Sequence, residues 1–214
     1  MKFRAVLFDF DGTLADSFAA ITASVNHVRS SVQLAEMTEE EVRGYVGYGL
    51  PQLLTDLVPG LNVDEAVLRY REHHFGTMVA NTRLYPLVLE TLKTLNEAGL
   101  KLGICSNKAV GFTKTLVNQL GLDDYISTVC GPEDAYGKPK PAPDMLWEAC
   151  RRLGVPNTEA LYVGDMSVDV QAATNAKMPV WLVHVGVAGR QTLTDFADVR
   201  VLKEFSDVLE VFNR

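Results

Sequence analysis

The amino-acid sequence predicts an α/β protein with a doubly wound parallel sheet and an inserted helical segment. Of the six residues Phe3–Phe8, five are apolar, the near-continuous pattern of a strand that is covered on both faces. From Tyr85 onward, helical and strand patterns alternate with short connections, which favours parallel strands joined by helices. Residues 15–82 carry only helical patterns. We therefore expect a core of residues 1–14 and 83–214 and an inserted helical domain of residues 15–82.

The inserted segment is predicted to contain four helices. Its first helix carries apolar residues at spacings of three and four, namely Phe18, Ile21, Val25, Val28 and Val32. Thr38 and Glu41 are spaced as a capping box at the start of a second helix. Pro51 suits the first turn of a third helix, and Asp64 is expected to cap a fourth.

The alternating part begins with a helix that Gly99 ends. The strands and helices expected after it are a strand at 101–106, a helix at 110–120, a strand at 126–130, a helix at 143–153, a strand at 160–164, a helix at 168–176, a strand at 180–185, an edge strand at 199–202 and a terminal helix from Ser206. Short connections between these elements predict a single compact sheet.

Composition narrows the class of protein. The 214 residues carry a net charge of -7, which argues against a nonspecific nucleic-acid partner. The cysteines Cys105, Cys130 and Cys150 are odd in number and have no CxxC spacing, so neither a disulfide framework nor a zinc site is expected. A reducing cytoplasm is the expected location. The chain begins almost directly with the first strand, and no apolar run approaches the ~18 residues of a membrane span, so neither a signal peptide nor a membrane span is expected.

Two carboxylates follow the first strand. Side chains alternate along an extended chain, so Asp9 and Asp11 tend to project to one side, and Gly12 lets the backbone leave the strand. The carboxyl end of a buried strand is where open α/β sheets place their sites. The pair Asp11-Gly12 alone is equally compatible with a simple turn in which Asp11 accepts a hydrogen bond from its own backbone.

Three further polar signals fall at the ends of predicted strands or in the loops beside them. Ser106 and the backbone N–H groups that follow it, beginning with Asn107, could hold a phosphate, although a serine there is more often a helix cap. Asp165 and Asp169 lie one helical turn apart, a spacing also typical of a turn and cap. Lys138 belongs to Gly-Lys-Pro-Lys-Pro, in which prolines stiffen the loop; alone, it or its neighbouring lysine is usually a solvated cation.

The opening string Asp-Phe-Asp-Gly-Thr-Leu and these three later signals, in this order, resemble the four motifs of the haloacid dehalogenase-like superfamily. The resemblance covers essentially the whole chain. It is strongest to the phosphoglycolate phosphatase-like members, which have a Rossmann-like core and a small helical cap inserted just after the first motif. This chain departs from the usual pattern at Met166, where relatives often carry Ser, and at Ala176-Lys177, where Ala-Gly is common.

The resemblance implies a role for each motif residue. Asp9 is expected to be the nucleophile and Asp11 the general acid and base. Ser106 would bind phosphate and Lys138 would stabilise charge. The resemblance makes Asp165 and Asp169 the acids on the metal side of the site. Together with Asp9 and the Asp11 backbone carbonyl, they are the expected metal-binding residues.

A magnesium ion suits this chemistry. An anionic carboxylate attacks an anionic ester only if cations neutralise the charge, and Mg²⁺ needs only one or two carboxylates because it keeps several waters. We therefore expect Mg²⁺-dependent hydrolysis of a small phosphorylated metabolite through an aspartyl-phosphate, with phosphoglycolate as the first guess and no membrane partner. The protein is expected to be a monomer or homodimer.

Other functions stay open. Asp11 counts against dehalogenation, and residues 15–82 contain no lysine, which counts against a Schiff-base phosphonate hydrolase. A β-phosphoglucomutase-like sugar-phosphate mutase, a nucleotidase and a pyrophosphatase all remain possible. A phosphate-binding scaffold that has lost turnover is the alternative outside enzymes, and the intact motif residues speak against it, namely Asp9, Asp11, Lys138, Asp165 and Asp169.

Substrate discrimination is expected from the cap. Its most irregular stretch, residues 43–50, contains Gly47 and Gly49, which let backbone approach a substrate closely. Arg43 could pair with a substrate carboxylate through its planar guanidinium, or the stretch could be a helix-helix turn in which Arg43 is solvated. The histidines, His27, His73, His74 and His184, lack metal-ligand spacing and are expected to be structural.

Overall fold

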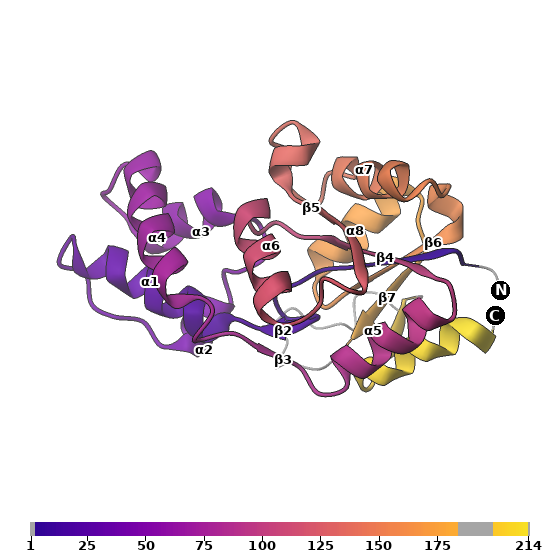
Figure 1. The fold of residues 1–214 in the computed structure, drawn as a ribbon. Helices are drawn as coiled ribbons and strands as arrows, with labels where there is room; N and C mark the ends of the chain where they lie inside the picture. The colour runs from indigo at the N-terminus through magenta and orange to yellow at the C-terminus, as the bar shows by residue number, and fades with distance from the viewer. Residues whose placement is uncertain (1–2, 184–198, 214) are drawn as a thin grey trace.

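The computed structural model describes residues 3–183 and 199–213, and its centre is a six-stranded sheet with the order β5-β4-β1-β6-β7-β8 (Figure 1). All neighbouring strands in this sheet are parallel. The strands are β1 (Ala5–Phe8), β4 (Lys101–Cys105), β5 (Ile126–Cys130), β6 (Ala160–Gly164), β7 (Val180–Val183) and β8 (Arg200–Leu202). The predicted parallel α/β class is confirmed. His184 and Val185, expected in the fifth strand, lie outside the described residues.

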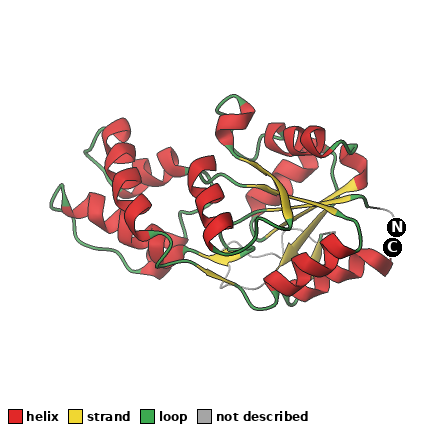
Figure 2. Ribbon diagram, viewed as in Figure 1, coloured by secondary structure: helices red, strands yellow, loops and turns green. Residues whose placement is uncertain are grey.

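Helices cover both faces of the sheet (Figure 2). Packing on one face comes from α5 (Val88–Glu97), α6 (Val110–Gln119) and the 3₁₀ helix η4 (Phe205–Asn213), and on the other from α7 (Asp144–Leu153) and α8 (Ser167–Ala176). Short 3₁₀ turns occur at η1 (Pro132–Ala135) and η2 (Asn157–Glu159). Strand β1 alternates between the faces, because Val6 and Phe8 join one apolar cluster and Ala5 and Leu7 the other. The strand is thereby buried on both sides.

The inserted helical segment stands at one end of the sheet and has an apolar core of its own (Figure 1). Its helices are α1 (Phe18–Ser30), α2 (Glu39–Arg43), α3 (Leu50–Leu57) and α4 (Val63–Thr77). Two short antiparallel strands, β2 (Ala15–Asp16) and β3 (Arg83–Leu84), lie where the chain enters and leaves it. The expectation of helix alone over residues 15–82 therefore missed β2, because two residues are too few to show a period.

Local signals placed most helix ends correctly. The capping box is present, since Thr38 accepts a hydrogen bond from Glu41 N at 3.3 Å and its own N–H donates to Glu41 Oε2 at 2.7 Å. The cap of α4 was predicted at Asp64, which is wrong: Asn62 Oδ1 accepts from Asp64 N at 2.9 Å. Within the described ranges, no helix combines the length and apolar character that a membrane crossing requires.

Candidate active site

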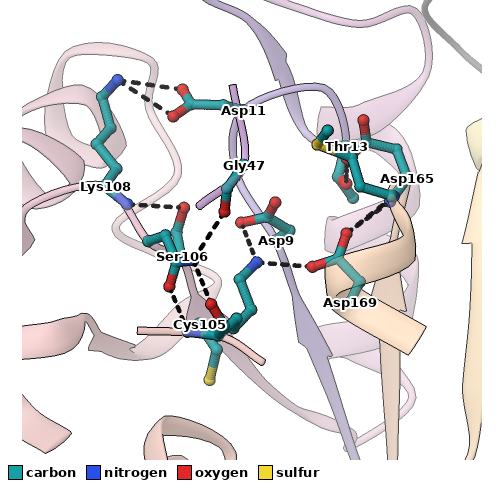
Figure 3. A network of polar contacts seen from close by, with 12 residues as sticks. Asp9, Asp11, Thr13, Gly47, Cys105, Ser106, Lys108, Asp165 and Asp169 are labelled. Atoms are coloured by element: carbon teal, nitrogen blue, oxygen red, sulfur yellow. Dashed lines mark hydrogen bonds and ion pairs between the residues drawn. The ribbon is translucent and has the colours of Figure 1, made fainter. Parts of the chain in front are cut away.

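The carboxyl edge of three adjacent strands gathers the acidic residues of the predicted site (Figure 3). Asp9 follows β1, Ser106 follows β4 and Asp165 follows β6, and β1 lies between the other two strands. Asp169 joins them from the first turn of α8. This is the edge at which parallel sheets open their sites, as expected.

Three carboxylates form one cluster at this edge. Asp9, Asp165 and Asp169 each offer an oxygen within 4.8 Å of the others. Burial raises the pKa of Asp9 to about 6, with the neighbouring Asp169 adding to the rise and Lys140 opposing it. Burial, followed by the charges of Asp169 and Asp9, also raises the pKa of Asp165 well above its usual value. The site therefore concentrates negative charge where little water can screen it.

Glycines make the close packing of these acids possible. Gly12 has φ +89°, and a Cβ at that position would lie 2.3 Å from Asp165 Oδ2. A Cβ at Gly164 would lie 2.4 Å from Asp169 Oδ2. Larger residues at either position would push the carboxylates apart, so the glycines after β1 and at the end of β6 set the spacing of the acids.

The buried cation beside Asp9 is Lys140. Its Nζ lies 2.9 Å from Asp9 Oδ1 and 2.7 Å from Asp169 Oδ1, and its side chain is 1% exposed. Burial lowers its pKa, but the two carboxylates outweigh that effect and the net pKa is raised. Lys140 is therefore a permanent cation inside the acidic cluster.

This placement corrects the expectation for Lys138. The Lys138 ammonium donates to Asp144 Oδ1 at 2.8 Å, and its side chain is 57% exposed. Both lysines belong to the same Lys-Pro-Lys-Pro run, so the sequence could not rank them. The structure does so through Asn107, whose Oδ1 accepts from Lys140 N at 2.6 Å and whose Nδ2 donates to Lys140 O at 3.0 Å. Asn107 thus holds the backbone of Lys140 against the end of β4.

Asp169 is a fully engaged carboxylate. Its Oδ2 accepts from the backbone N–H groups of Asp165 at 3.1 Å and Met166 at 3.0 Å. Its Oδ1 accepts from Lys140 Nζ and, at 3.2 Å, from the Tyr162 hydroxyl. Asp169 consequently orients both Lys140 and the loop that carries Asp165.

The cluster suits a hard divalent cation. Asp9 Oδ1 is buried and accepts no hydrogen bond within the part of the chain that the structure describes, its contact with Lys140 being ionic. Asp165 accepts from Thr13 Oγ1 through Oδ1 at 2.8 Å. Buried carboxylates crowded around a single cation leave negative charge that a metal would balance, and carboxylate oxygens are the ligands that Mg²⁺ prefers. Asp9 and Asp165 fit this role better than Asp169, whose oxygens are already engaged.

Asp11 lies on the other side of Asp9 and has its own cation. Lys108 Nζ donates to Asp11 Oδ1 at 3.2 Å and Oδ2 at 3.3 Å, and the Ser17 hydroxyl donates to Oδ1 in a short hydrogen bond. The Lys108 side chain is only 5% exposed. Sequence reasoning missed Lys108, because a lysine two residues beyond Ser106 carries no signal by itself; only the fold brings it to Asp11.

A pocket opens beside Asp9 and Asp11 between the sheet edge and the insertion. The core contributes Asp9, Asp11, Ser106, Asn107, Lys108, Ala109, Phe112 and Met166, and the insertion contributes Ile21, Val46, Gly47, Gly49, Leu50, Leu53 and Tyr70. Gly47 and Gly49 both have positive φ, at +128° and +92°. Asn107 Nδ2 also donates to Gly47 O at 2.7 Å, which ties this loop to the core. The structure therefore brings Ser106, Asn107, Gly47 and Gly49 to one pocket with Asp9.

Arg43 lies apart from the residues that line this pocket. Its Nη2 donates to Glu39 Oε1 at 2.6 Å and lies 3.7 Å from Asp16 Oδ1. The guanidinium carbon lies 3.7 Å from the centre of the Phe18 ring. The side chain is 15% exposed, so Arg43 is neither solvated nor directed at a substrate in this structure. Its predicted contact with a substrate carboxylate has no support from this geometry.

Comparison of the sequence with known proteins identifies the family to which the chain belongs. The family model for haloacid dehalogenase-like hydrolases matches residues 6–183, which include all the motif residues above. The chain belongs to this family. Curated proteins that are similar over most of this chain include phosphoglycolate phosphatases.

Particular relatives show how far the similarity extends. A phosphoglycolate phosphatase of Rhodobacter capsulatus is 35% identical over 82% of this chain and 81% of its own length. One from Rhodospirillum rubrum is 31% identical over 96% of this chain and 89% of its own. A crystal structure from Haemophilus somnus, described as a predicted phosphoglycolate phosphatase, superposes with a TM-score of 0.88 at 26% identity and covers 99% of both chains.

Proposed function

We propose that this protein is a Mg²⁺-dependent phosphatase that hydrolyses a small phosphate monoester through an aspartyl-phosphate on Asp9. Phosphoglycolate is the first candidate substrate, supported by the names of the relatives. The observation that carries the proposal is the position of Asp9, which lies 2.9 Å from the buried Lys140 ammonium, belongs to the acidic cluster and lines the pocket. A carboxylate in that position is a nucleophile with cationic support for the charge that develops during attack.

In the first half of the reaction, an Asp9 oxygen attacks phosphorus and the bond from phosphorus to the ester oxygen breaks. Lys140 balances charge at Asp9, while Ser106 and the N–H groups at the start of the α6 region donate to phosphate oxygens. Asp11 gives a proton to the departing alkoxide, which leaves as an alcohol. The Mg²⁺, held by Asp9 and Asp165, would supply electrostatic neutralisation of the phosphoryl oxygens.

In the second half, water hydrolyses the aspartyl-phosphate. Asp11, now a carboxylate, takes a proton from the water as its oxygen attacks phosphorus, and the Asp9–phosphorus bond breaks to release inorganic phosphate. Asp11 ends the cycle protonated, ready for the next ester. Ser17 and Lys108 hold the Asp11 carboxylate in place between these two proton transfers.

The experiment is a screen of small phosphate monoesters with Mg²⁺, read as phosphate release, for the wild type and for Asp9→Asn. We expect wild-type turnover that excess chelator removes, and loss of turnover in Asp9→Asn with an unchanged circular dichroism spectrum, because the substitution keeps the volume and removes the nucleophile. Acid-quenched wild type should carry one added phosphoryl group by intact mass, and the variant none.

Asp124→Asn is the matched control, because Asp124 is an exposed carboxylate in the loop before β5. It should retain wild-type turnover. Activity of Asp9→Asn within tenfold of the wild type, or full wild-type activity in chelator, would rule out the proposed mechanism.

A further inference from the structure

Lys108 is a buried cation that faces the pocket and that the steps above use only as a support for Asp11. Its side chain is 5% exposed, and its Nζ lies 3.2 and 3.3 Å from the two Asp11 oxygens. Among the described residues that line the pocket, it is the one with a cationic side chain. In this position Lys108 already binds one carboxylate, that of Asp11, with both of its oxygens within hydrogen-bond distance.

The described residues in the rest of the pocket provide no second cation that could bind an anionic leaving group. The insertion side of the pocket is formed by the apolar residues Ile21, Val46, Leu50 and Leu53, with Tyr70 and two glycines. Arg43 is paired with Glu39 and does not line the pocket, and Lys140 is shared by Asp9 and Asp169. A negatively charged leaving group in contact with this wall would have only the neutral Tyr70 hydroxyl to replace its water, unless it reached the charged Lys108.

Geometry limits how long such a leaving group can be. Asp11 protonates the ester oxygen, so that oxygen binds next to the Asp11 carboxylate. Lys108 Nζ lies about one hydrogen-bond length from the same carboxylate. An anionic group one or two carbons from the ester oxygen can therefore reach Lys108, and a longer chain would overshoot into the apolar wall.

We infer that Lys108 is the residue that selects the substrate, by binding a carboxylate carried one or two carbons from the phosphate ester oxygen. The substrate class is then the short phosphorylated hydroxy acids, as opposed to phosphate esters of neutral alcohols. This inference rests on the proposed phosphatase activity and assigns to Lys108 the recognition that the sequence suggested for Arg43.

The experiment compares two esters of similar size, phosphoglycolate and 2-hydroxyethyl phosphate, in the wild type and in Lys108→Met. Because Lys108 also contacts Asp11, activity on both esters will fall, so the decisive quantity is the ratio of their kcat/KM values. We expect this preference for phosphoglycolate to fall about 10–100-fold in Lys108→Met, the range for a lost hydrogen bond to a charged group. Lys108→Arg should retain more of the preference than Lys108→Met, since it keeps the charge.

Lys114→Met serves as the control, because Lys114 is an exposed lysine on α6 a few residues further along. It should leave the preference unchanged, and circular dichroism should show that each variant is folded. A preference that changes less than threefold in Lys108→Met would overturn the inference while leaving the phosphatase proposal intact. Wild-type protein that hydrolyses neither these esters nor any other monoester would overturn both.

Discussion

The two walls of the pocket differ in kind. The sheet edge contributes charged side chains that have ionic partners: Asp9 pairs with Lys140, and Asp11 pairs with Lys108. The insertion contributes no charged side chain among the described residues that line the pocket. This division separates two tasks. Under the proposed function, the edge would hold and neutralise the phosphate, and the insertion would limit the shape of the group to which the phosphate is attached.

One side-chain amide bridges the two walls. Asn107 Nδ2 donates both to Gly47 O of the insertion and to Lys140 O of the core, and its Oδ1 accepts from Lys140 N. The loop around Gly47 also touches Met166, since a Cβ at Gly47 would lie 3.0 Å from the Met166 thioether. Met166 is the position at which this chain departs from the Ser of many relatives, and its contact is with the insertion.

The largest loss of activity and stability is expected from a substitution on the sheet-edge side, at Lys140. Lys140→Met removes the cation between Asp9 and Asp169, so we expect kcat to fall about 10²–10³-fold, the range for a lost charge-stabilising group. The free energy of unfolding should also fall by about 3–5 kcal/mol, because two buried carboxylates lose their partner. Steady-state kinetics and denaturant unfolding, each with Mg²⁺ present and absent, measure the two losses.

Lys138→Met is the matched control two residues away. Lys138 is exposed and forms a surface ion pair with Asp144, so its loss should change the free energy of unfolding by no more than about 1 kcal/mol. A loss of activity in Lys138→Met as large as in Lys140→Met would restore the role that the sequence suggested for Lys138 and contradict the assignment made from the structure.

The sequence predicted most of the fold because the relevant signals are local. Apolar runs marked β1 and β6, and Thr38 with Glu41 marked the start of α2. Signals that depend on a competing neighbour were less reliable. Asn62 and Asp64 are both good helix caps two residues apart, and only the backbone decides between them. The terminal helix was expected from Ser206, and the structure places a helix at Phe205–Asn213; its 3₁₀ hydrogen bonding is a feature that apolar spacing does not report.

The residues of the candidate site show the same difference between local and tertiary signals. The acids Asp9, Asp165 and Asp169 follow predicted strands or begin a predicted helix, so knowledge of the parallel sheet was enough to place them together. The cations come from elsewhere. Lys108 and Lys140 lie in loops, and their positions depend on tertiary contacts with Asp11 and Asn107 that no sequence period encodes. The sequence therefore predicted that cations must balance the acids of the site, but it did not identify which lysines do so.

An intermediate effect should appear in the insertion as a dependence of stability on pH. His74 is 1% exposed, and its Nδ1 lies 3.0 Å from Ser24 Oγ. Burial, with the nearby charge of Lys108, lowers its pKa to about 3, while Asp11 opposes the change and His73 adds slightly to it. His74 is thus neutral in the folded protein, whereas the unfolded chain takes up a proton below about pH 6.5.

The contribution of His74 to stability should therefore decline as pH falls below about 6.5, because the unfolded state takes up the proton. The slope for one histidine is about 1.4 kcal/mol per pH unit, which gives a loss of about 2 kcal/mol between pH 7 and pH 5. Asp9 and Asp165 have raised pKa values, so they take up protons in the folded protein as pH falls and oppose this loss in both proteins. Urea unfolding at both pH values should therefore show a change in stability that is less favourable by about 2 kcal/mol in the wild type than in His74→Gln on going from pH 7 to pH 5. Identical pH dependence in the wild type and His74→Gln would contradict a buried neutral His74.

The smallest effect is expected at Arg43, and it tests where recognition lies. Arg43 pairs with Glu39 and Asp16 and covers the Phe18 ring, so it joins α2 to the strand by which the chain enters the insertion. Arg43→Ala should lower the free energy of unfolding by about 1–2 kcal/mol, as a partly buried cation-π contact and ion pair are lost. Because the side chain does not line the pocket, activity on phosphoglycolate and on 2-hydroxyethyl phosphate should fall by the same factor. A loss confined to phosphoglycolate would return the carboxylate-binding role to Arg43, and the guanidinium would then have to leave Glu39 and enter the pocket when substrate binds.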